Sequence, residues 1–237
     1  MIGIIGAMGQ EISCLCKAMG KYDYKKINNF EFYTGKIAKK KCTVLRSGIG
    51  KVNAAVGCSI LIQRFHPDFI INTGSAGGLL PDQKIGDAII STGLVYHDVD
   101  LTAFNYVPGQ LPGQPAIFPV DERFVKIAED AIDELKNEKI LPDSINHVRG
   151  LIGSGDTFVH QPLHIEELRR RFPNVAAVEM EGAAIAHCCK LFSVPALVIR
   201  ALSDIAGTES PMSFEEFLPI ASSHSAQIVM RIVNKLD

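Results

Sequence analysis

Short, nearly continuous apolar runs alternate along this chain with longer segments of helical spacing, and this alternation is the feature that most limits its possible folds. Continuous apolar runs are typical of strands buried on both faces, as in parallel sheets covered by helices. The predicted strands are 1–6, 30–37, 42–46, 68–72, 88–92, 148–152, 175–178 and 196–201, and the predicted helices are 9–18, 51–65, 121–137, 182–192 and 214–235. The hairpin 30–46 requires some antiparallel pairing, so we expect an α/β protein with a mixed, largely parallel central sheet.

Length and composition narrow the class further. The 237 residues contain no Pro/Gly/Ser-rich linker and no repeat, so we expect a single domain over 1–237. With 24 basic and 26 acidic residues the net charge is −2, which argues against a nucleic-acid partner. No apolar run approaches the roughly 18 residues of a membrane span, so no membrane partner is expected. The chain starts without the basic segment of a signal peptide, so we expect a cytoplasmic protein.

Six cysteines and one His/Asp-rich segment are the candidates for a metal site. The cysteines are Cys14, Cys16, Cys42, Cys58, Cys188 and Cys189, and no two of them have the C-x-x-C spacing of a zinc site. We expect reduced thiols that act as small buried apolar side chains. The segment 96–100 (YHDVD) is interpreted as a loop-stabilising hydrogen-bond cluster, with a metal site as the alternative. The prediction is therefore no metal and no cofactor.

Glycines and acidic residues follow the predicted strands, and in open α/β sheets ligands bind beyond the carboxyl ends of the strands. The segments concerned are 6–8, 47–50, 73–78, 153–158, 179–181 and 203–204. The segment 48–53 resembles a dinucleotide fingerprint but has Asn53 at its final position and no acid at the end of the next strand. We therefore interpret 48–50 as a tight turn beside a ligand, and the glycine-rich 72–78 as a binding turn.

Four acidic residues in these positions point to catalysis. Glu179 and Glu181 follow an apolar run, Asp204 follows another, and Glu11 comes shortly after the first strand. Each has an ordinary structural explanation, such as a helix N-terminus, an N-cap or a surface position. Together at one edge of a sheet they favour a reaction driven by carboxylates.

The stretch 96–119 is long and rich in Gly and Pro, and it carries Phe104, Tyr106 and Phe118. A segment of this length without predicted secondary structure is usually functional. We expect it to form a lid or a contact between subunits.

Several motifs occur together and in order: GIIGAM followed by Glu11, SGIGKVNAA, INTGSAGGL, YHDVDLTAF, GQLPG, GLIGSGDTF, AVEMEGAAIAH, VIRALSD and SFEEFL. In this combination the chain resembles the 5'-methylthioadenosine/S-adenosylhomocysteine nucleosidases of the nucleoside phosphorylase superfamily. The resemblance implies a single-domain α/β/α sandwich that hydrolyses the N-glycosidic bond of 5'-thioadenosines to adenine and a 5-substituted ribose. It also implies a homodimer in which the loop 96–119 contributes to the neighbouring site.

The resemblance also implies roles for individual residues. Asp204 would protonate adenine N7, and burial would help it to keep that proton. Glu11 would activate water, and Glu181 would bind the ribose hydroxyls and stabilise the cationic sugar. The other implied substrate contacts are Met8, Ile49, Ser75, Ala76, Gly77, Leu101, Phe104, Tyr106, Pro112 (from the partner), Phe158, Val159, Glu179, Met180, Ser203 and Phe214.

Two alternatives remain open at this stage. A phosphorylase of the same fold would use phosphate in place of water, and a nucleoside-binding or storage protein would lack turnover. The negative charge of Glu11 would repel phosphate, which argues against a phosphorylase. A storage protein could lose the acids without losing its fold, and this chain keeps them. Preference among methylthioadenosine, S-adenosylhomocysteine, 5'-deoxyadenosine and futalosine-type substrates is not fixed by these residues.

Overall fold

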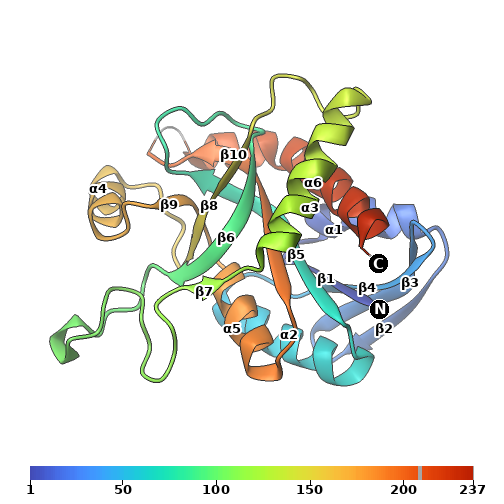
Figure 1. Cartoon of the computed structure of the whole chain (residues 1–237), viewed down its shortest axis with the longest axis horizontal. Helices are drawn as coiled ribbons and strands as arrows, with labels where there is room; N and C mark the ends of the chain where they lie inside the picture. The colour runs from blue at the N-terminus through green and yellow to red at the C-terminus, as the bar shows by residue number, and fades with distance from the viewer. Residues whose placement is uncertain (208–209, 237) are drawn as a thin grey trace.

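The computed structural model describes residues 1–207 and 210–236 and contains one mixed β-sheet with helices on both faces (Figure 1). The strands are β1 (Ile2–Gly6), β2 (Tyr22–Ile27), β3 (Phe30–Ile37), β4 (Lys40–Arg46), β5 (Phe69–Gly78), β6 (Ala88–Tyr96), β7 (Phe118–Pro119), β8 (His147–Ser154), β9 (Val175–Glu179) and β10 (Ala196–Ile205). The helices are α1 (Gly9–Met19), α2 (Lys51–Phe65), α3 (Glu122–Asn137), α4 (Pro162–Arg171), α5 (Gly182–Phe192) and α6 (Ser210–Lys235), with a 3-10 turn η1 (Thr102–Phe104). The predicted α/β class is confirmed.

The sheet has an open part and a closed part. In the open part β1 lies parallel to β4 and β5, and β3 and β2 extend it antiparallel beyond β4. In the closed part β5 pairs with β10, β10 with β6, β6 with β8, β8 with β9, and β9 returns to β5. These five strands form a ring of hydrogen-bonded neighbours.

Two helical layers cover the sheet, as predicted. Leu15 of α1, Ile132 of α3 and Val229 of α6 belong to one buried apolar cluster. Leu61 of α2 and Ile185 of α5 belong to another, which lies against the opposite face. Burying one such side chain stabilises the fold by about 1.5–3 kcal/mol, so the two clusters hold the three layers together. In the described part of the chain, no helix is both long and apolar enough to cross a membrane.

Several strands are longer than predicted, and the longest extensions that reach a cavity at the edge of the sheet are those of β5 and β10. The expected turn at 72–78 is wrong, because β5 continues to Gly78 and pairs there with β10 and β9. Its small residues allow the three strands to approach closely. β10 likewise continues to Ile205, so that Ser203 and Asp204 lie within the strand and not after it.

Four elements were not predicted from the sequence: β2, β7, η1 and α4. β2 (YDYKKI) is almost wholly exposed, so its sequence lacks the alternating apolar pattern that predicts a strand. It forms by pairing with β3. α4 begins at Pro162 and buries only Ile165 and Leu168, which gives a weak apolar pattern.

Candidate active site

A cavity of about 290 Å³ lies where β1, β5, β9 and β10 end, at the predicted edge of the sheet. It is lined by Ala7, Met8, Glu11, Ile49, Ser75, Ala76, Gly77, Phe158, Val178, Glu179, Met180, Glu181, Ser203, Asp204 and Phe214. Val159 lines a cavity of about 30 Å³ beside it, which shares Gly77, Phe158 and Asp204. The structure therefore brings together fourteen of the eighteen predicted site residues.

The other four predicted residues do not line this cavity. They are Leu101, Phe104, Tyr106 and Pro112, all in the segment between β6 and β7. Figure 1 shows this segment, in green, extending away from the body of the molecule. It is tied to the sheet by β7, which pairs with β6, and by the backbone N–H of His97, which donates to the Ser154 carbonyl, whereas Phe104 is 71% exposed. The contact of Leu101, Phe104 and Tyr106 with the substrate, and the contribution of Pro112 by a partner subunit, therefore stay predictions.

Glu11 is positioned by backbone N–H groups at the start of α1. Its Oε2 accepts hydrogen bonds from the N–H groups of Ala7 (2.8 Å) and Met8 (3.0 Å), and its Oε1 accepts one from Ser75 (3.1 Å). A Cβ at Gly74 would lie 2.5 Å from Oε1, so this glycine is required for the close approach of β5. The Ser75 hydroxyl is a fourth donor, at 3.4 Å from Oε1, so hydrogen bonds from Ala7, Met8 and Ser75 fix both oxygens of the carboxylate.

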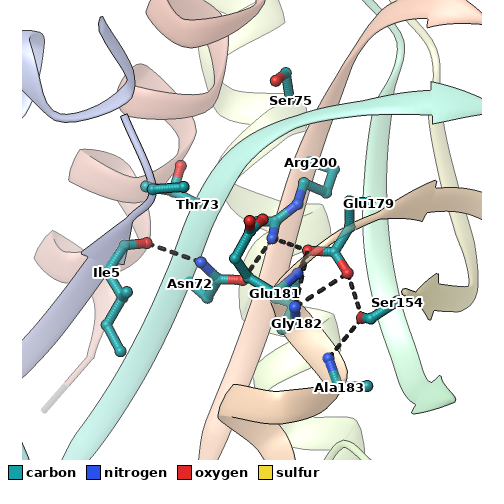
Figure 2. Close-up of polar contacts among 12 residues, drawn as sticks. Ile5, Asn72, Thr73, Ser75, Ser154, Glu179, Glu181, Gly182, Ala183 and Arg200 are labelled. Carbon is teal, nitrogen blue, oxygen red and sulfur yellow. Dashed lines mark hydrogen bonds and ion pairs between the residues drawn. The ribbon is translucent and has the colours of Figure 1, made fainter. Parts of the chain in front are cut away.

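Glu179 is at the centre of a buried polar network (Figure 2). Its carboxylate accepts hydrogen bonds from the N–H groups of Glu181 and Gly182, from the Ser154 hydroxyl and from the Arg200 guanidinium. Burial raises the pKa of Glu179, but the Arg200 charge and these hydrogen bonds outweigh it and hold the pKa below its usual range. Glu179 thus satisfies the N-terminus of α5, a role that leaves the Glu181 side chain free to point elsewhere.

Arg200 was not predicted as a site residue, although it is among the largest fully buried side chains in the described residues. It pairs with Glu179 and donates to Asn72 Oδ1 at 2.6 Å, and Asn72 in turn donates to the Ile5 carbonyl at 2.9 Å (Figure 2). The available signal was an arginine inside an otherwise apolar run, since a buried arginine needs a carboxylate partner.

Glu181 reaches across the cavity to the turn at 48–50. Its Oε1 accepts a hydrogen bond from the Gly50 N–H at 2.8 Å, with Gly50 at φ 96°, a conformation that favours glycine. Burial, together with the negative charge of Glu179, raises the pKa of Glu181 to about 8. At neutral pH this carboxyl is therefore mainly protonated, whereas the resemblance implied a carboxylate that stabilises the cationic sugar.

Asp204 lies beside a bulge in β10. The pairing with β5 passes from Leu202 opposite Ala76 to Asp204 opposite Gly77, so Ser203 is the additional residue. The Ser203 hydroxyl donates to Asp204 Oδ1 at 2.9 Å, and Asp204 is 2% exposed. Bulges often redirect a side chain next to an active site.

Two aromatic rings complete the cavity lining. The rings of Phe158 and Phe214 lie 5.8 Å apart at 73°. Among the described residues that line the cavity there is no lysine or arginine. Within the described part of the chain no group of three or more His, Cys, Asp or Glu is arranged to hold a metal, and all six cysteines are free thiols.

Comparisons with known proteins place the chain in a family. Residues 1–234 match the phosphorylase superfamily. A 5'-methylthioadenosine/S-adenosylhomocysteine nucleosidase from Geobacillus sp. (strain WCH70) is 48% identical, over 100% of this chain and 99% of that protein. Such a nucleosidase from Colwellia psychrerythraea 34H, solved with adenine, has a TM-score of 0.94 at 43% identity, covering 99% of this chain and 95% of that one. The enzyme from Neisseria meningitidis, solved with methylthio-immucillin-A, has the same TM-score and identity and covers 99% of each chain.

Proposed function

The chain belongs to the 5'-methylthioadenosine/S-adenosylhomocysteine nucleosidases of the phosphorylase superfamily, and on that basis we propose how it cleaves these nucleosides. It is an N-glycosidic hydrolase that converts methylthioadenosine and S-adenosylhomocysteine to adenine and a 5-substituted ribose, and we add 5'-deoxyadenosine as a further substrate. The single observation that carries the mechanism is the meeting of Glu11, Glu181 and Asp204 around one cavity, each no more than 7% exposed.

Asp204 is the general acid of the proposed reaction. Cleavage leaves electrons on the adenine ring, and a proton delivered to N7 stabilises the leaving group. The Ser203 hydroxyl donates to Oδ1 and thereby supports Oδ2 as the oxygen that carries the proton.

Glu11 is the general base. Its carboxylate is held in place by Ala7, Met8 and Ser75, so it can orient a water molecule toward the anomeric carbon without reorganising. The ionised carboxylate also favours the positive charge that develops on the sugar ring.

Glu181 binds the ribose hydroxyls. Because its pKa is raised to about 8, its protonated oxygen can donate one hydrogen bond while Oε1 remains fixed by Gly50. Glu179 lines the cavity, but both of its oxygens are already occupied, so its proposed part is to hold Arg200 and the start of α5.

The remaining lining residues bind the two ends of the substrate. Phe158 stacks on adenine, and the Val159 backbone contacts the purine edge. Ser75, Ala76 and Gly77 form the wall on the purine side, with Ser203 behind them. Met8, Ile49, Met180 and Phe214 pack against the ribose and its 5'-sulfur.

A homodimer completes the 5' end of the site in this proposal. Leu101, Phe104, Tyr106 and Pro112 lie on a segment that leaves its own cavity open, and Phe104 exposes a large apolar surface. Such a surface is typical of a subunit contact. The six free thiols suit a reducing compartment, which supports a cytoplasmic location.

The test is adenine release from methylthioadenosine, S-adenosylhomocysteine, 5'-deoxyadenosine and a futalosine-type nucleoside, each with and without phosphate. Release without phosphate supports the hydrolase. A requirement for phosphate would identify a phosphorylase, which the lack of Lys and Arg among the described lining residues disfavours. Tight binding with no release would identify a storage protein.

A further inference from the structure

Asp98 lies outside the cavity but joins two of its walls. Its Oδ2 accepts a hydrogen bond from Lys51 Nζ at 2.6 Å and another from the Asp156 N–H at 2.9 Å. Asp156 Oδ1 in turn accepts the Lys51 N–H at 2.8 Å. Lys51, Asp98 and Asp156 therefore form a closed triangle of contacts.

Each corner of this triangle comes from a different part of the sheet edge. Lys51 is the first residue of α2, directly after Gly50, whose N–H holds Glu181. Asp156 follows β8 and stands two residues before Phe158. The triangle thus connects the proposed adenine platform to the anchor of the proposed ribose ligand.

The packing beneath the triangle leaves it little freedom. His97 is 5% exposed, and its backbone N–H donates a hydrogen bond to the Ser154 carbonyl at 2.9 Å. A Cβ on Gly155 would lie only 2.4 Å from the His97 ring, so the loop after β8 rests directly on that ring. The position of the Phe158 loop relative to the sheet is therefore fixed by His97, the residue next to Asp98.

The triangle is held by charge as well as by geometry. Burial raises the pKa of Asp98, but the Lys51 ammonium and the Asp156 N–H outweigh it and keep the pKa below its usual range. Asp98 is thus ionised at neutral pH. Charge-assisted hydrogen bonds are roughly twice as strong as neutral ones, so loss of Asp98 should release both partners.

We propose that Asp98 is a positioning residue that makes the adenine side and the ribose side of the cavity move as one unit. It does so by tying the Phe158 loop to the Gly50–Glu181 contact through Lys51 and Asp156. The inference rests on the proposed function for its kinetic consequences, although the structural tie can be tested without substrate.

The kinetic test compares Asp98→Ala, Lys51→Met and the double variant with Asp130→Ala. Asp130 is the matched control, since it forms an exposed ion pair with Lys126 on α3 at 2.9 Å. We expect Asp98→Ala to lower kcat/KM about 10- to 100-fold, the loss typical of a small misplacement of substrate. The Asp98→Ala variant should also have a higher KM, and adenine should inhibit it about 10-fold more weakly. Its kcat should fall as well, because the Gly50 N–H that holds Glu181 is no longer fixed. The control should change by less than about 2-fold.

Two further measurements separate positioning from general stability. The double variant should be no worse than Asp98→Ala alone within about 2-fold, because both substitutions break the same triangle. In ligand-free protein, the amide hydrogens of Lys51 and Asp156 should exchange at least about 10-fold faster in Asp98→Ala than in the control.

The outcomes are distinct. If the wild type releases no adenine, the proposed function fails, and the exchange rates alone decide the structural tie. If the wild type is active but Asp98→Ala behaves like Asp130→Ala, or the Asp98 and Lys51 effects multiply, the positioning role is overturned and the proposed function stands.

Discussion

The buried carboxyl of Glu181 predicts a specific dependence of stability on pH. Burial and the Glu179 charge raise its pKa from 4.5 to about 8 in the folded protein, and the unfolded chain should keep the lower value. A carboxyl with a raised pKa stabilises the fold while it is protonated. That contribution is complete below about pH 4.5 and is lost as the pH rises toward 8.

Glu181→Gln removes this titration while it keeps the side-chain shape and an acceptor for the Gly50 N–H. One pKa unit corresponds to about 1.4 kcal/mol, so between pH 5 and 8 the wild type should lose about 3 kcal/mol more unfolding free energy than the variant. The assay is urea unfolding of both proteins at pH 5, 6, 7 and 8, at one protein concentration. Parallel curves, with a difference that stays constant over this range, would refute the reasoning.

Four further predictions concern single side chains. Asp204→Asn should lower turnover by at least about 10³-fold while calorimetry still detects adenine binding, and unchanged turnover would exclude the general-acid role. Glu11→Gln should abolish hydrolysis to a similar extent, so a near-normal rate would exclude it as the base. Gly74→Ala places a Cβ 2.5 Å from Glu11 Oε1 and should lower kcat about 10- to 100-fold, a result contradicted by wild-type kinetics. Arg200→Met leaves Glu179 without its counter-charge and should cost about 3–5 kcal/mol in urea unfolding; a loss below about 1 kcal/mol would mean that the pair is not structurally important.

The sequence predicted the parts of the fold that have a buried face. The apolar spacing of α2 and α5 gave their bounds correctly, because one side of each helix packs against the sheet. β2 was missed because it is exposed on nearly every residue, and only pairing with β3 makes it a strand. The extension of β5 through its glycines was missed for a related reason. Partners on both sides, which are distant in sequence, override the local preference of glycine for turns.

The acids proposed as catalytic were predictable as site residues because charged residues soon after apolar runs are unusual. The network around Glu179 was not predictable, since Arg200, Asn72 and Ser154 come from three strands whose neighbours depend on the sheet order. The bulge at Ser203 and the raised pKa of Glu181 also depend on packing across the sheet. Sequence spacing thus indicated which acidic groups gather at the cavity, whereas the three-dimensional arrangement determines their protonation and support.

The closed ring of β5, β10, β6, β8 and β9 also limits which insertions and deletions the chain can tolerate. A strand at an open edge can slide by two residues and keep its facing side chains, but a strand in a ring has neighbours on both sides that fix its register. Removing one residue between Ala196 and Leu202 of β10 would therefore turn Asp204 to the other face, with no slippage available to restore it. Changes of length should be confined to the connections, such as the segment between β6 and β7.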